Sequence, residues 1–449
     1  MISKDFRIPC DKFYILFYMQ RIVQTFSLGD VVEITTKQKE KIKGRFIPSP
    51  NPHSITLKLD SGYNIGILKE KVASINLVKR HIEKEMTSLK ITQQKGLPTI
   101  AILHTGGTIS SRVSYDTGGV TASFTPEELL AKFPELHEMA NITSKQVMNM
   151  MSEDMRFSHY KLLAHAIQDE IKKGVDGIII GHGTDTIAVT AAALAFMLEH
   201  VPIPVILVGA QRSADRGSTD ARLNMLSAAY FITHGNFRGV ALCMHESSND
   251  ENCVILPATK TKKLHTSRRD AFKPVNALPI ARVQYAQKKI EYLHHASSPV
   301  QGTFVVRDKF EEKVAIVKTY PNMFSHLLDA LIAQKYKGLV LEGSGIGQAP
   351  TNIKEDLPLY HSLQRFITKG GVVVLTSNCI FGEVHPYIYT NCRRLEEIGV
   401  IFGKDMLTET AFIKLAWLLG TYPHKDVPKL MTENLRGEIT SRLPYQELP

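Results

Sequence analysis

The feature that most constrains the fold is a series of short, wholly apolar segments that alternate with longer helical ones. After about residue 97 the apolar segments cover 99–103, 177–180, 204–208 and 239–243. Strands that are apolar along their whole length are buried on both faces. Strands that alternate with helices form parallel sheets. The sequence therefore predicts an α/β domain with a doubly wound sheet and helices on both of its faces.

A second series of the same kind follows a polar stretch. Its apolar segments cover 314–317, 338–341 and 371–375. We therefore expect two α/β domains, one over 98–283 and one over 311–420. Residues 284–310 are expected to be the linker between them, and 421–449 a tail that faces a partner.

The N-terminal part follows a different pattern. Between residues 28 and 71, apolar and polar residues alternate in short runs that are separated by turns rich in Pro, Gly and Asn. A period of two with frequent turns predicts a small antiparallel barrel of the SH3-like type. We expect residues 72–97 to be a charged helical linker and residues 1–27 an extension. Such barrels are more often docking modules than enzymes.

Composition limits where the chain works. The longest apolar runs, 187–198 and 201–210, are shorter than the ~20 residues that span a bilayer. We therefore expect a soluble protein without a membrane segment. Five cysteines without a C-x-x-C pair favour the reducing cytoplasm over a disulfide framework. The 54 Lys and Arg against 44 Asp and Glu, a net charge of +10, are compatible with a nucleic-acid partner and equally with simple solubility.

Two loops after predicted strands carry hydroxyl groups. In α/β sheets, ligands bind at the carboxyl ends of the strands. The first loop is Thr105-Gly-Gly-Thr108, in which glycines allow close approach to a ligand and free N–H groups can stabilise an oxyanion. The second contains Thr184 and Asp185 at a predicted helix start. Because Thr and Asp are favoured N-cap residues, these two side chains could also have a purely structural role.

The densest basic segment, 260–273, supplies a third element, Lys263. A lysine beside an aspartate in a closed site can act as a base toward a threonine hydroxyl if burial lowers its pKa enough. The sequence alone does not show that these residues are close together. It contains no P-loop motif, and its histidines are not spaced as metal ligands, so we expect no metal site and no cofactor in this chain.

Several motifs occur in an order that resembles bacterial-type L-asparaginases. They include the threonine loops above and a segment with Lys263 ahead of Ala271-Phe272, and the resemblance spans about residues 98–419. Longer matches, including the segment 264–272 and a preceding barrel with the segment 59–67, resemble the D subunit of the archaeal glutamyl-tRNA(Gln) amidotransferase. This second resemblance covers about residues 28–417. The matched segments are 105–109, 152–155, 181–186, 208–217, 264–272 and 381–386.

The resemblance implies a glutaminase subunit that hydrolyses glutamine and supplies ammonia to a partner, the E subunit of the same amidotransferase. That partner would bind ATP and magnesium and amidate Glu-tRNA(Gln). The chain would be cytoplasmic and form a homodimer within a heterotetramer, and the tRNA would be held mainly by the partner. Within the basic segment, Arg268 and Arg269 are then expected to orient the loop or an interface.

The resemblance also assigns roles to residues. Thr108 would be the nucleophile, and Thr184, Asp185 and Lys263 would form a triad of hydroxyl, carboxylate and base. Tyr115 would support the nucleophile. In this superfamily either threonine could attack first, and we favour Thr108.

Three further residues would bind the substrate. Gly107 is expected to present its backbone N–H, while Ser152 and Glu153 would hold the α-carboxylate and α-amino groups. Glu153 is acidic where asparaginases usually carry Gln, which changes how a substrate ammonium group is held.

Two other interpretations remain. The chain could be a free-standing L-asparaginase with an added barrel, and its preference for glutamine or asparagine is not decided by sequence. The barrel and the Arg268-Arg269-Asp270-Ala271-Phe272 signature argue against this interpretation. A non-catalytic scaffold with the same fold is a further alternative, against which the intact set of Thr108, Thr184, Asp185 and Lys263 argues.

Overall fold

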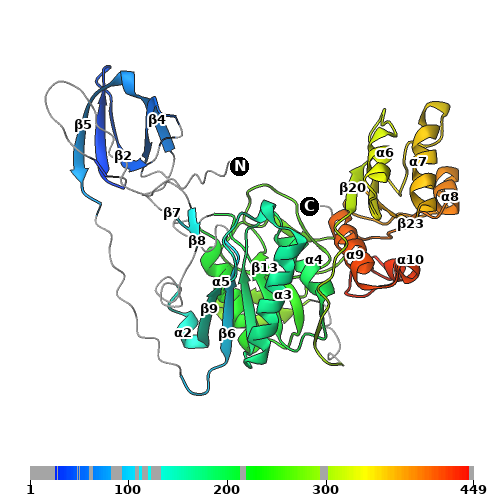
Figure 1. Cartoon of the computed structure of the whole chain (residues 1–449). Coiled ribbons are helices and arrows are strands. Elements are labelled where there is room, and N and C mark those ends of the chain that lie inside the picture. The colour runs from blue at the N-terminus through cyan, green and yellow to red at the C-terminus, as the bar shows by residue number, and fades with distance from the viewer. Residues whose placement is uncertain are drawn as a thin grey trace, which may run out of the picture. The chain divides into compact units, whose positions relative to one another are not determined.

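In a computed structural model, the chain forms two compact units (Figure 1). The first unit comprises Met1–Thr87 and Arg112–Thr121, and the second comprises Ser88–Ser111 and Ala122–Pro449. At 111–113 and 120–122 the structure describes the backbone alone, as the strand pair β7 (Ser111–Val113) and β8 (Val120–Ala122). The described residues are 26–27, 29–47, 49, 51–59, 64–81, 94–106, 111–113, 120–122, 133–212, 219–293 and 302–443.

The first unit contains a five-stranded antiparallel sheet. In β1 every second residue is buried, because side chains on a strand point to opposite faces in turn. The buried residues form a small apolar core: Val32, Ile34, Ile55, Leu57, Ile67 and Val72. Across the sheet the strands are β4 (Asn64–Leu68), β3 (Ser54–Lys58), β2 (Lys41–Ile47), β1 (Val31–Thr36) and β5 (Val72–Lys79).

The prediction of a helical linker over 72–97 is wrong for its first part. Val72–Lys79 is strand β5, which pairs with β1 along its length. Ile75 and Leu77 pack against the core in which Val72 is buried. The lysines on both sides of this segment suggested a solvated helix, whereas its own alternation has a period of two. Residues 82–93 of the predicted linker and most of the extension 1–27 lie outside the described residues.

An eight-stranded sheet forms the centre of the N-terminal α/β domain. Five neighbouring strands, β9, β6, β10, β12 and β13, are parallel to one another. The remaining three, β14, β17 and β18, are joined to them and to one another by antiparallel pairing. This arrangement confirms the predicted fold class and adds an antiparallel extension. Across the sheet the strands are β18 (Lys289–Tyr292), β17 (Ala281–Gln284), β14 (Cys253–Pro257), β13 (Gly239–His245), β12 (Pro204–Val208), β10 (Gly177–Gly181), β6 (Thr99–His104) and β9 (Asn141–Gln146).

Helices cover both faces of this sheet (Figure 1). On one face lie α3 (Phe157–Lys172) and α4 (Ile187–Met197). On the other lie α2 (Leu136–Met139) and α5 (Ala221–His234). The apolar strands therefore have no solvated face, which explains why they contain so few polar residues.

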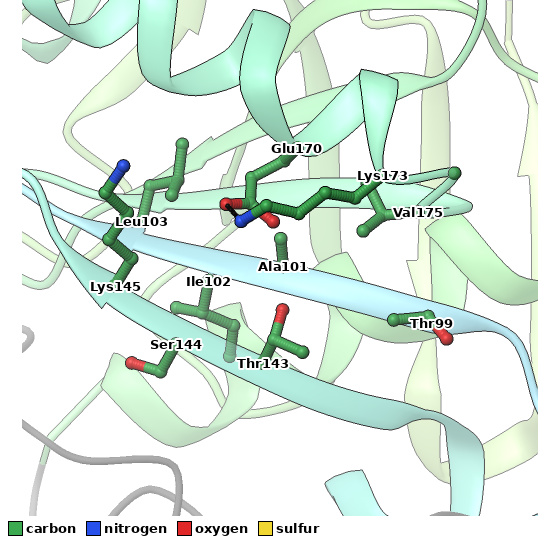
Figure 2. A pocket seen from close by; sticks show the side chains of 11 residues that line it. Thr99, Ala101, Ile102, Leu103, Thr143, Ser144, Lys145, Glu170, Lys173 and Val175 are labelled. Atoms are coloured by element: carbon green, nitrogen blue, oxygen red, sulfur yellow. Dashed lines mark hydrogen bonds and ion pairs between the residues drawn. The ribbon is translucent and has the colours of Figure 1, made fainter.

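A cavity of about 470 Å³ lies between the C-terminal end of α3 and the outer strands β6 and β9 (Figure 2). Ala101 has a small side chain there, and Lys173 forms an ion pair with Glu170 at 2.7 Å. The cavity is lined by Thr99, Ala101, Ile102, Leu103, Thr143, Ser144, Lys145, Glu170, Lys173, Gly174 and Val175. None of the residues predicted to act on a substrate lines it.

The predicted linker 284–310 is partly regular structure. Lys289–Tyr292 is β18, the last strand of the large sheet, and Val305–Val306 is β19, which pairs with β11 (Leu198–Glu199). An edge strand carries polar residues on its exposed side, so β18 looked like a linker in the sequence. Residues 294–301 lie outside the described part of the chain.

The C-terminal α/β domain has a four-stranded parallel sheet. Its strands in order are β20 (Val314–Lys318), β21 (Gly338–Gly343), β22 (Val372–Ser377) and β23 (Ile401–Phe402). The helices that accompany it are α6 (His326–Ala333), α7 (Leu357–Thr368), α8 (Thr390–Glu397), α9 (Thr408–Thr421) and α10 (Val427–Thr432).

The tail after residue 420, as far as the structure describes it, packs on the rest of the chain, and whether it also faces a partner stays a prediction. α10 packs against α9, and Val427, Met431 and Ile439 are buried in the large apolar cluster. Glu438 is buried as well and forms an ion pair with Lys414 at 2.6 Å. The tail therefore belongs to the folded core of this unit.

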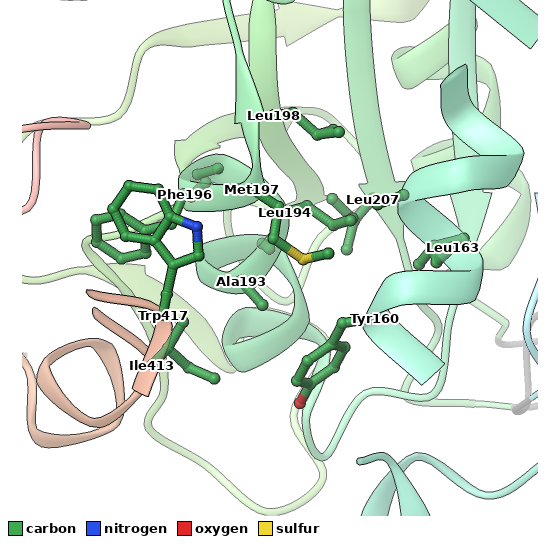
Figure 3. Packing of buried hydrophobic residues seen from close by; sticks show 14 of the residues in the cluster. Tyr160, Leu163, Ala193, Leu194, Phe196, Met197, Leu198, Leu207, Ile413 and Trp417 are labelled. Carbon is green, nitrogen blue, oxygen red and sulfur yellow. The ribbon is translucent and has the colours of Figure 1, made fainter. Parts of the chain in front are cut away.

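α9 joins the two α/β domains. It packs against α4 of the N-terminal domain and against β21 of the C-terminal domain. The Trp417 ring stacks on Phe196 with ring centroids 5.5 Å apart (Figure 3). Its indole N–H donates to the carbonyl of Arg307 at 3.1 Å. Both rings are fully buried, so this contact ties the domains together by apolar burial.

Phe196→Ala is expected to lower the free energy of unfolding by about 3–5 kcal/mol, because it leaves a cavity beside the buried indole. Urea unfolding followed by circular dichroism measures the change, and Trp417, the single tryptophan of the chain, reports locally by fluorescence. The control Phe324→Ala, at a side chain that is 62% exposed, should change it by less than about 0.5 kcal/mol. Equal effects of the two changes would contradict the packing described.

Candidate active site

Lys263 contacts both members of the predicted threonine–aspartate pair. Its Nζ donates to Thr184 Oγ1 at 3.0 Å and to Asp185 Oδ1 at 2.7 Å. The Lys263 side chain is 14% exposed and that of Asp185 64%. The structure thus brings together a hydroxyl, a carboxylate and an amine from segments that are nearly 80 residues apart in sequence.

The positions of these residues follow from the strands that carry them. Thr184 and Asp185 follow β10, at the carboxyl end of the parallel sheet, immediately before α4. Lys263 is the last residue of β15 (Thr261–Lys263), which pairs with β16 (Phe272–Pro274) in a hairpin. The carboxyl end of a parallel sheet is where an α/β protein collects functional side chains.

The capping role that the sequence left open does not account for this pair. The N-cap of α4 is Thr186, and no side chain makes a capping hydrogen bond there. Thr186 Oγ1 instead donates to the carbonyl of Ser152 at 2.6 Å. Thr184 and Asp185 point to Lys263, so the geometry favours a chemical role over a structural one.

Ser152 lies against the same loop. It is buried in the short helix η3 (Ser152–Asp154), whereas Glu153 beside it is exposed. A Cβ atom at Gly183 would lie 2.8 Å from Ser152 Cβ, so only glycine fits here without displacement. Gly209 is likewise required, because a Cβ there would lie 2.8 Å from Thr184 Cγ2. Sequence reasoning missed both glycines as packing partners of the site.

The first threonine loop begins beside these residues. The backbone N–H and the hydroxyl of Thr105 both donate to the carbonyl of Gly181, at 3.0 and 3.1 Å. Gly106 has a φ of +109°, and a Cβ there would lie 2.4 Å from the carbonyl oxygen of Met150. The chain therefore enters the loop next to β10 and η3. Gly107, Thr108 and Tyr115 lie outside the described residues, so their roles stay predictions.

His182 holds the loop that carries Thr184 through hydrogen bonds of its ring. A carbonyl can only accept, so Nδ1 carries the proton and donates to Gly183 O at 2.7 Å, while Nε2 accepts from the Thr190 hydroxyl at 2.9 Å. Burial lowers the pKa of His182 to about 4. The ring is therefore neutral near pH 7 and acts as a packing residue. Among the described residues, no group of His, Cys, Asp and Glu is arranged to hold a metal ion.

Arg268 and Arg269 hold the loop between β15 and β16. The Arg268 guanidinium donates two hydrogen bonds to Asp270, at 2.9 and 2.6 Å. Arg269 forms an ion pair with Asp250 and donates to the carbonyl of Ser248. Both contacts are within the chain and fit the expected role of orienting this loop.

Three family models match the chain, and together they cover both structural units. The model described as "GatD N-terminal domain" matches residues 26–78. The model "Asparaginase, N-terminal" matches 99–298, and "Glutaminase/Asparaginase C-terminal domain" matches 313–431. The first match includes all of strand β5 except its last residue, in agreement with the structure.

Solved structures support the same fold. The thermostable L-asparaginase from Thermococcus kodakarensis has a TM-score of 0.68 at 28% identity and covers 77% of this chain and 100% of its own length. L-asparaginase I from Vibrio cholerae has a TM-score of 0.67 at 29% identity and covers 77% of this chain and 99% of its own. The fold and the site thus define a member of the asparaginase and glutaminase superfamily.

Relatives that match over nearly the full length narrow the family further. The D subunit of the glutamyl-tRNA(Gln) amidotransferase of Thermococcus kodakarensis is 42% identical over 429 residues, which are 93% of this chain and 95% of the relative. Its counterpart in Pyrococcus furiosus is 41% identical over 96% and 97%. The chain belongs to the D-subunit family of glutamyl-tRNA(Gln) amidotransferases, as the sequence motifs predicted.

The buried His182 makes stability depend on pH. Its folded pKa of about 4 lies below the ordinary value near 6.5, so the unfolded chain binds a proton that the folded chain does not. The stabilisation is complete above about pH 6.5 and is lost as the pH falls toward 4. We expect a loss of about 2 kcal/mol from this group between pH 7 and 5.

Urea unfolding of the full chain at the two pH values measures this loss. His182→Asn cannot titrate, so its unfolding free energy should fall by about 2 kcal/mol less than that of the wild type over the same range. If the unfolding free energy fell equally in the two proteins between pH 7 and 5, His182 would not be held neutral by burial.

Proposed function

We propose that this chain is the glutamine-hydrolysing subunit of a tRNA-dependent amidotransferase. It hydrolyses glutamine to glutamate and ammonia, and a partner uses the ammonia to convert Glu-tRNA(Gln) to Gln-tRNA(Gln). The observation that carries the proposal is the contact of Lys263 Nζ with both Thr184 Oγ1 and Asp185 Oδ1. Membership of the D-subunit family adds the nature of the substrate and of the partner.

The proposed chemistry has two halves. In the first, the Thr108 hydroxyl oxygen attacks the side-chain amide carbon of glutamine, and the C–N bond of the tetrahedral intermediate breaks as ammonia takes up the hydroxyl proton. In the second, water hydrolyses the resulting ester and releases glutamate and Thr108. Backbone N–H groups of the glycine loop, including Gly107, stabilise the oxyanion.

The triad would move the protons in these steps. An unprotonated Lys263 accepts a proton from the hydroxyl that it contacts, Thr184, and Asp185 stabilises the ammonium group that results. Thr184 is therefore suited to activate either Thr108 or the hydrolytic water. Tyr115 would support Thr108 from the loop that follows it.

Ser152 and Glu153 are proposed to bind the amino-acid end of the substrate. Ser152 is fixed by its contact with the Thr184 loop, because its carbonyl accepts from Thr186. The carboxylate of Glu153 is exposed and suits the α-ammonium group of glutamine. A carboxylate binds this cation more strongly than the neutral amide of a Gln residue could.

The partners proposed for this chain follow from its family. Amidation of Glu-tRNA(Gln) consumes ATP, and we assign ATP and magnesium to the partner, the E subunit. Two copies of this chain would form a homodimer within a heterotetramer, with the tRNA held mainly by the E subunit. No helix of the described residues is long and apolar enough to cross a membrane. We propose the cytoplasm as its location.

A free-standing L-asparaginase is the second candidate, because the similar solved structures carry that name. They leave about a quarter of this chain uncovered and are 28–29% identical to it. The D-subunit relatives are 41–42% identical over 93–96% of the chain. The N-terminal domain model also favours the amidotransferase.

Removal of the nucleophile or the base should abolish turnover. We expect Thr108→Ala and Lys263→Ala to lower ammonia release from glutamine by about three orders of magnitude or more in the complex with the E subunit. Lys262→Ala is the matched control: this neighbouring lysine forms a partly exposed ion pair with Glu409, and such pairs contribute little. Its activity should stay within about twofold of the wild type.

Ammonia release is measured with glutamine and with asparagine, with and without the E subunit and Glu-tRNA(Gln). The proposal predicts preference for glutamine and stimulation by the partner and the tRNA. Asparagine-preferring turnover by the isolated chain would favour the L-asparaginase instead. If Thr108→Ala and Lys263→Ala both kept most of the activity, the site assignment would be wrong.

A further inference from the structure

The segment that ends in Lys263 carries lysines that point to two different domains. Lys260 and Lys262 contact the C-terminal α/β domain, at Asp405 and Glu409. Lys263, the last residue of β15, contacts Thr184 and Asp185 of the N-terminal domain. Lys260 is the last residue of the turn before β15, and Lys263 is at the other end of that strand. The Lys262–Glu409 pair is partly exposed and adds little to the hold on the segment. Lys260 therefore anchors the start of β15 in the C-terminal domain, while Lys263 reaches the site in the N-terminal domain.

The contact of Lys260 with Asp405 is the most buried of these interactions. Lys260 is 1% exposed and Asp405 3%. Lys260 Nζ binds the Asp405 carboxylate and also donates to the carbonyl of Asp405 at 3.3 Å. The second carboxylate oxygen accepts from the backbone N–H of Thr440 at 3.0 Å. The ion pair thus joins the turn before β15, the loop after β23 and the C-terminal tail.

Further hydrogen bonds secure the turn before β15. The Thr410 hydroxyl donates to the carbonyl of Thr259 at 2.9 Å, and the Thr259 hydroxyl donates to the carbonyl of Arg436 at 3.2 Å. The carbonyl of Lys260 accepts from the N–H of Val275, just after β16, at 2.7 Å. Both strands of the hairpin are therefore linked at the end where Lys260 lies.

A buried ion pair is an expensive way to gain stability, since an apolar pair of similar size would avoid the loss of hydration. Burial does oppose the charge of Lys260, because it lowers the pKa of this lysine although Asp405 acts in the other direction. What an ion pair adds is direction, since its hydrogen bonds fix the position of both groups. Lys260 lies only three residues before Lys263, which is at most about 10 Å even along a fully extended chain.

We propose that Lys260 and Asp405 are positioning residues: their ion pair holds β15 so that the Lys263 amine stays within hydrogen-bond distance of Thr184 and Asp185. The C-terminal domain then determines where the base of the N-terminal domain lies. This inference rests on the proposed function, specifically on the role of Lys263. It accounts for a buried charge pair whose contacts, among the described residues, include none of the predicted site residues.

The chain offers a matched control for the test. Lys414 on α9 is also fully buried and forms an ion pair with the buried Glu438 at 2.6 Å. Its other hydrogen bonds are with the carbonyls of Met431 and Glu433. Lys260→Met and Lys414→Met therefore remove the same group from similar surroundings. Lys260 belongs to the segment that carries Lys263, whereas Lys414 reaches that segment only through Glu438 and the Arg436 backbone.

Both variants are assayed for glutamine hydrolysis in the assembled complex. Both should unfold at lower urea concentration than the wild type. Lys260→Met should lower kcat about 10- to 100-fold with KM changed less than about twofold, because a displacement of about 1 Å at the base is sufficient for such a loss. Lys414→Met should keep kcat within about twofold. Amide hydrogen exchange over Thr261–Lys263 should be faster in Lys260→Met alone.

Wild-type kcat and exchange in Lys260→Met would overturn the proposal, and so would equal losses of kcat in both variants. The variant Lys263→Ala distinguishes failure of the proposed catalytic function of Lys263 from failure of the positioning role of Lys260. If that variant kept activity, the proposed function of Lys263 would fail, whereas the exchange result would still test whether Lys260 holds β15. If it were inactive while Lys260→Met was normal, only the positioning role would fail.

Two further variants cover the case in which Lys260→Met does not fold. Asp405→Asn keeps an acceptor oxygen for Lys260, so a smaller loss of kcat is expected. The double variant Lys260→Met/Asp405→Leu replaces the pair by apolar side chains, which should recover stability. Its kcat should remain low if the polar contacts between Lys260 and Asp405 are what holds β15 in position. Recovery of kcat together with stability would contradict the positioning role.

Discussion

The buried parallel sheet is the constraint on which the rest of the catalytic unit depends. Its central strands, including β10 and β12, are buried along their whole length. Polar side chains can therefore emerge only where the strands end. The carboxyl end of β10 places Thr184 and Asp185 at such a point, and β15 brings Lys263 to them. The functional groups meet there because the apolar core leaves them no other position.

Three lysines near β15 and α9, Lys260, Lys263 and Lys414, differ in burial and in the kind of partner that they contact. Lys263 is 14% exposed and contacts a largely exposed carboxylate, so its contacts contribute little to folding. Lys260 and Lys414 are buried with buried partners, where loss of one partner is strongly destabilising. The exposed contact is available to a substrate, while the buried pairs hold the surrounding structure. The lysine proposed to be catalytic is thus distinct from the two lysines whose buried ion pairs support the fold.

Much of the fold was predictable because burial leaves a direct mark in the sequence. The segments predicted over 99–103 and 204–208 are β6 and β12, since a strand that is apolar on both faces must be covered on both faces. The edge strands β5 and β18 were not predicted, because an edge strand needs only alternate apolar residues and its charged neighbours obscured them. The buried tail around Glu438 was missed for a similar reason: a charged residue rarely indicates a core position unless its partner is known.

The candidate site was predictable in its residues but not in its geometry. The motifs identified Thr184, Asp185 and Lys263, yet their contact joins positions 78 and 79 residues apart, which no local pattern can show. The ion pair of Lys260 with Asp405 is separated by 145 residues and was not predicted. The alternating lysines at 260 and 262 were the available signal, although a short basic run is usually a solvated face.

Covalent trapping tests the central claim most directly, namely that a threonine at this site attacks the glutamine side chain. The assembled complex is incubated with a diazoketone analogue of glutamine, and the digested chain is analysed by mass spectrometry. The account predicts one adduct, on the peptide that contains Thr108, and its loss in Lys263→Ala. An adduct on the exposed Cys379 in place of that peptide, or an undiminished adduct in Lys263→Ala, would contradict it.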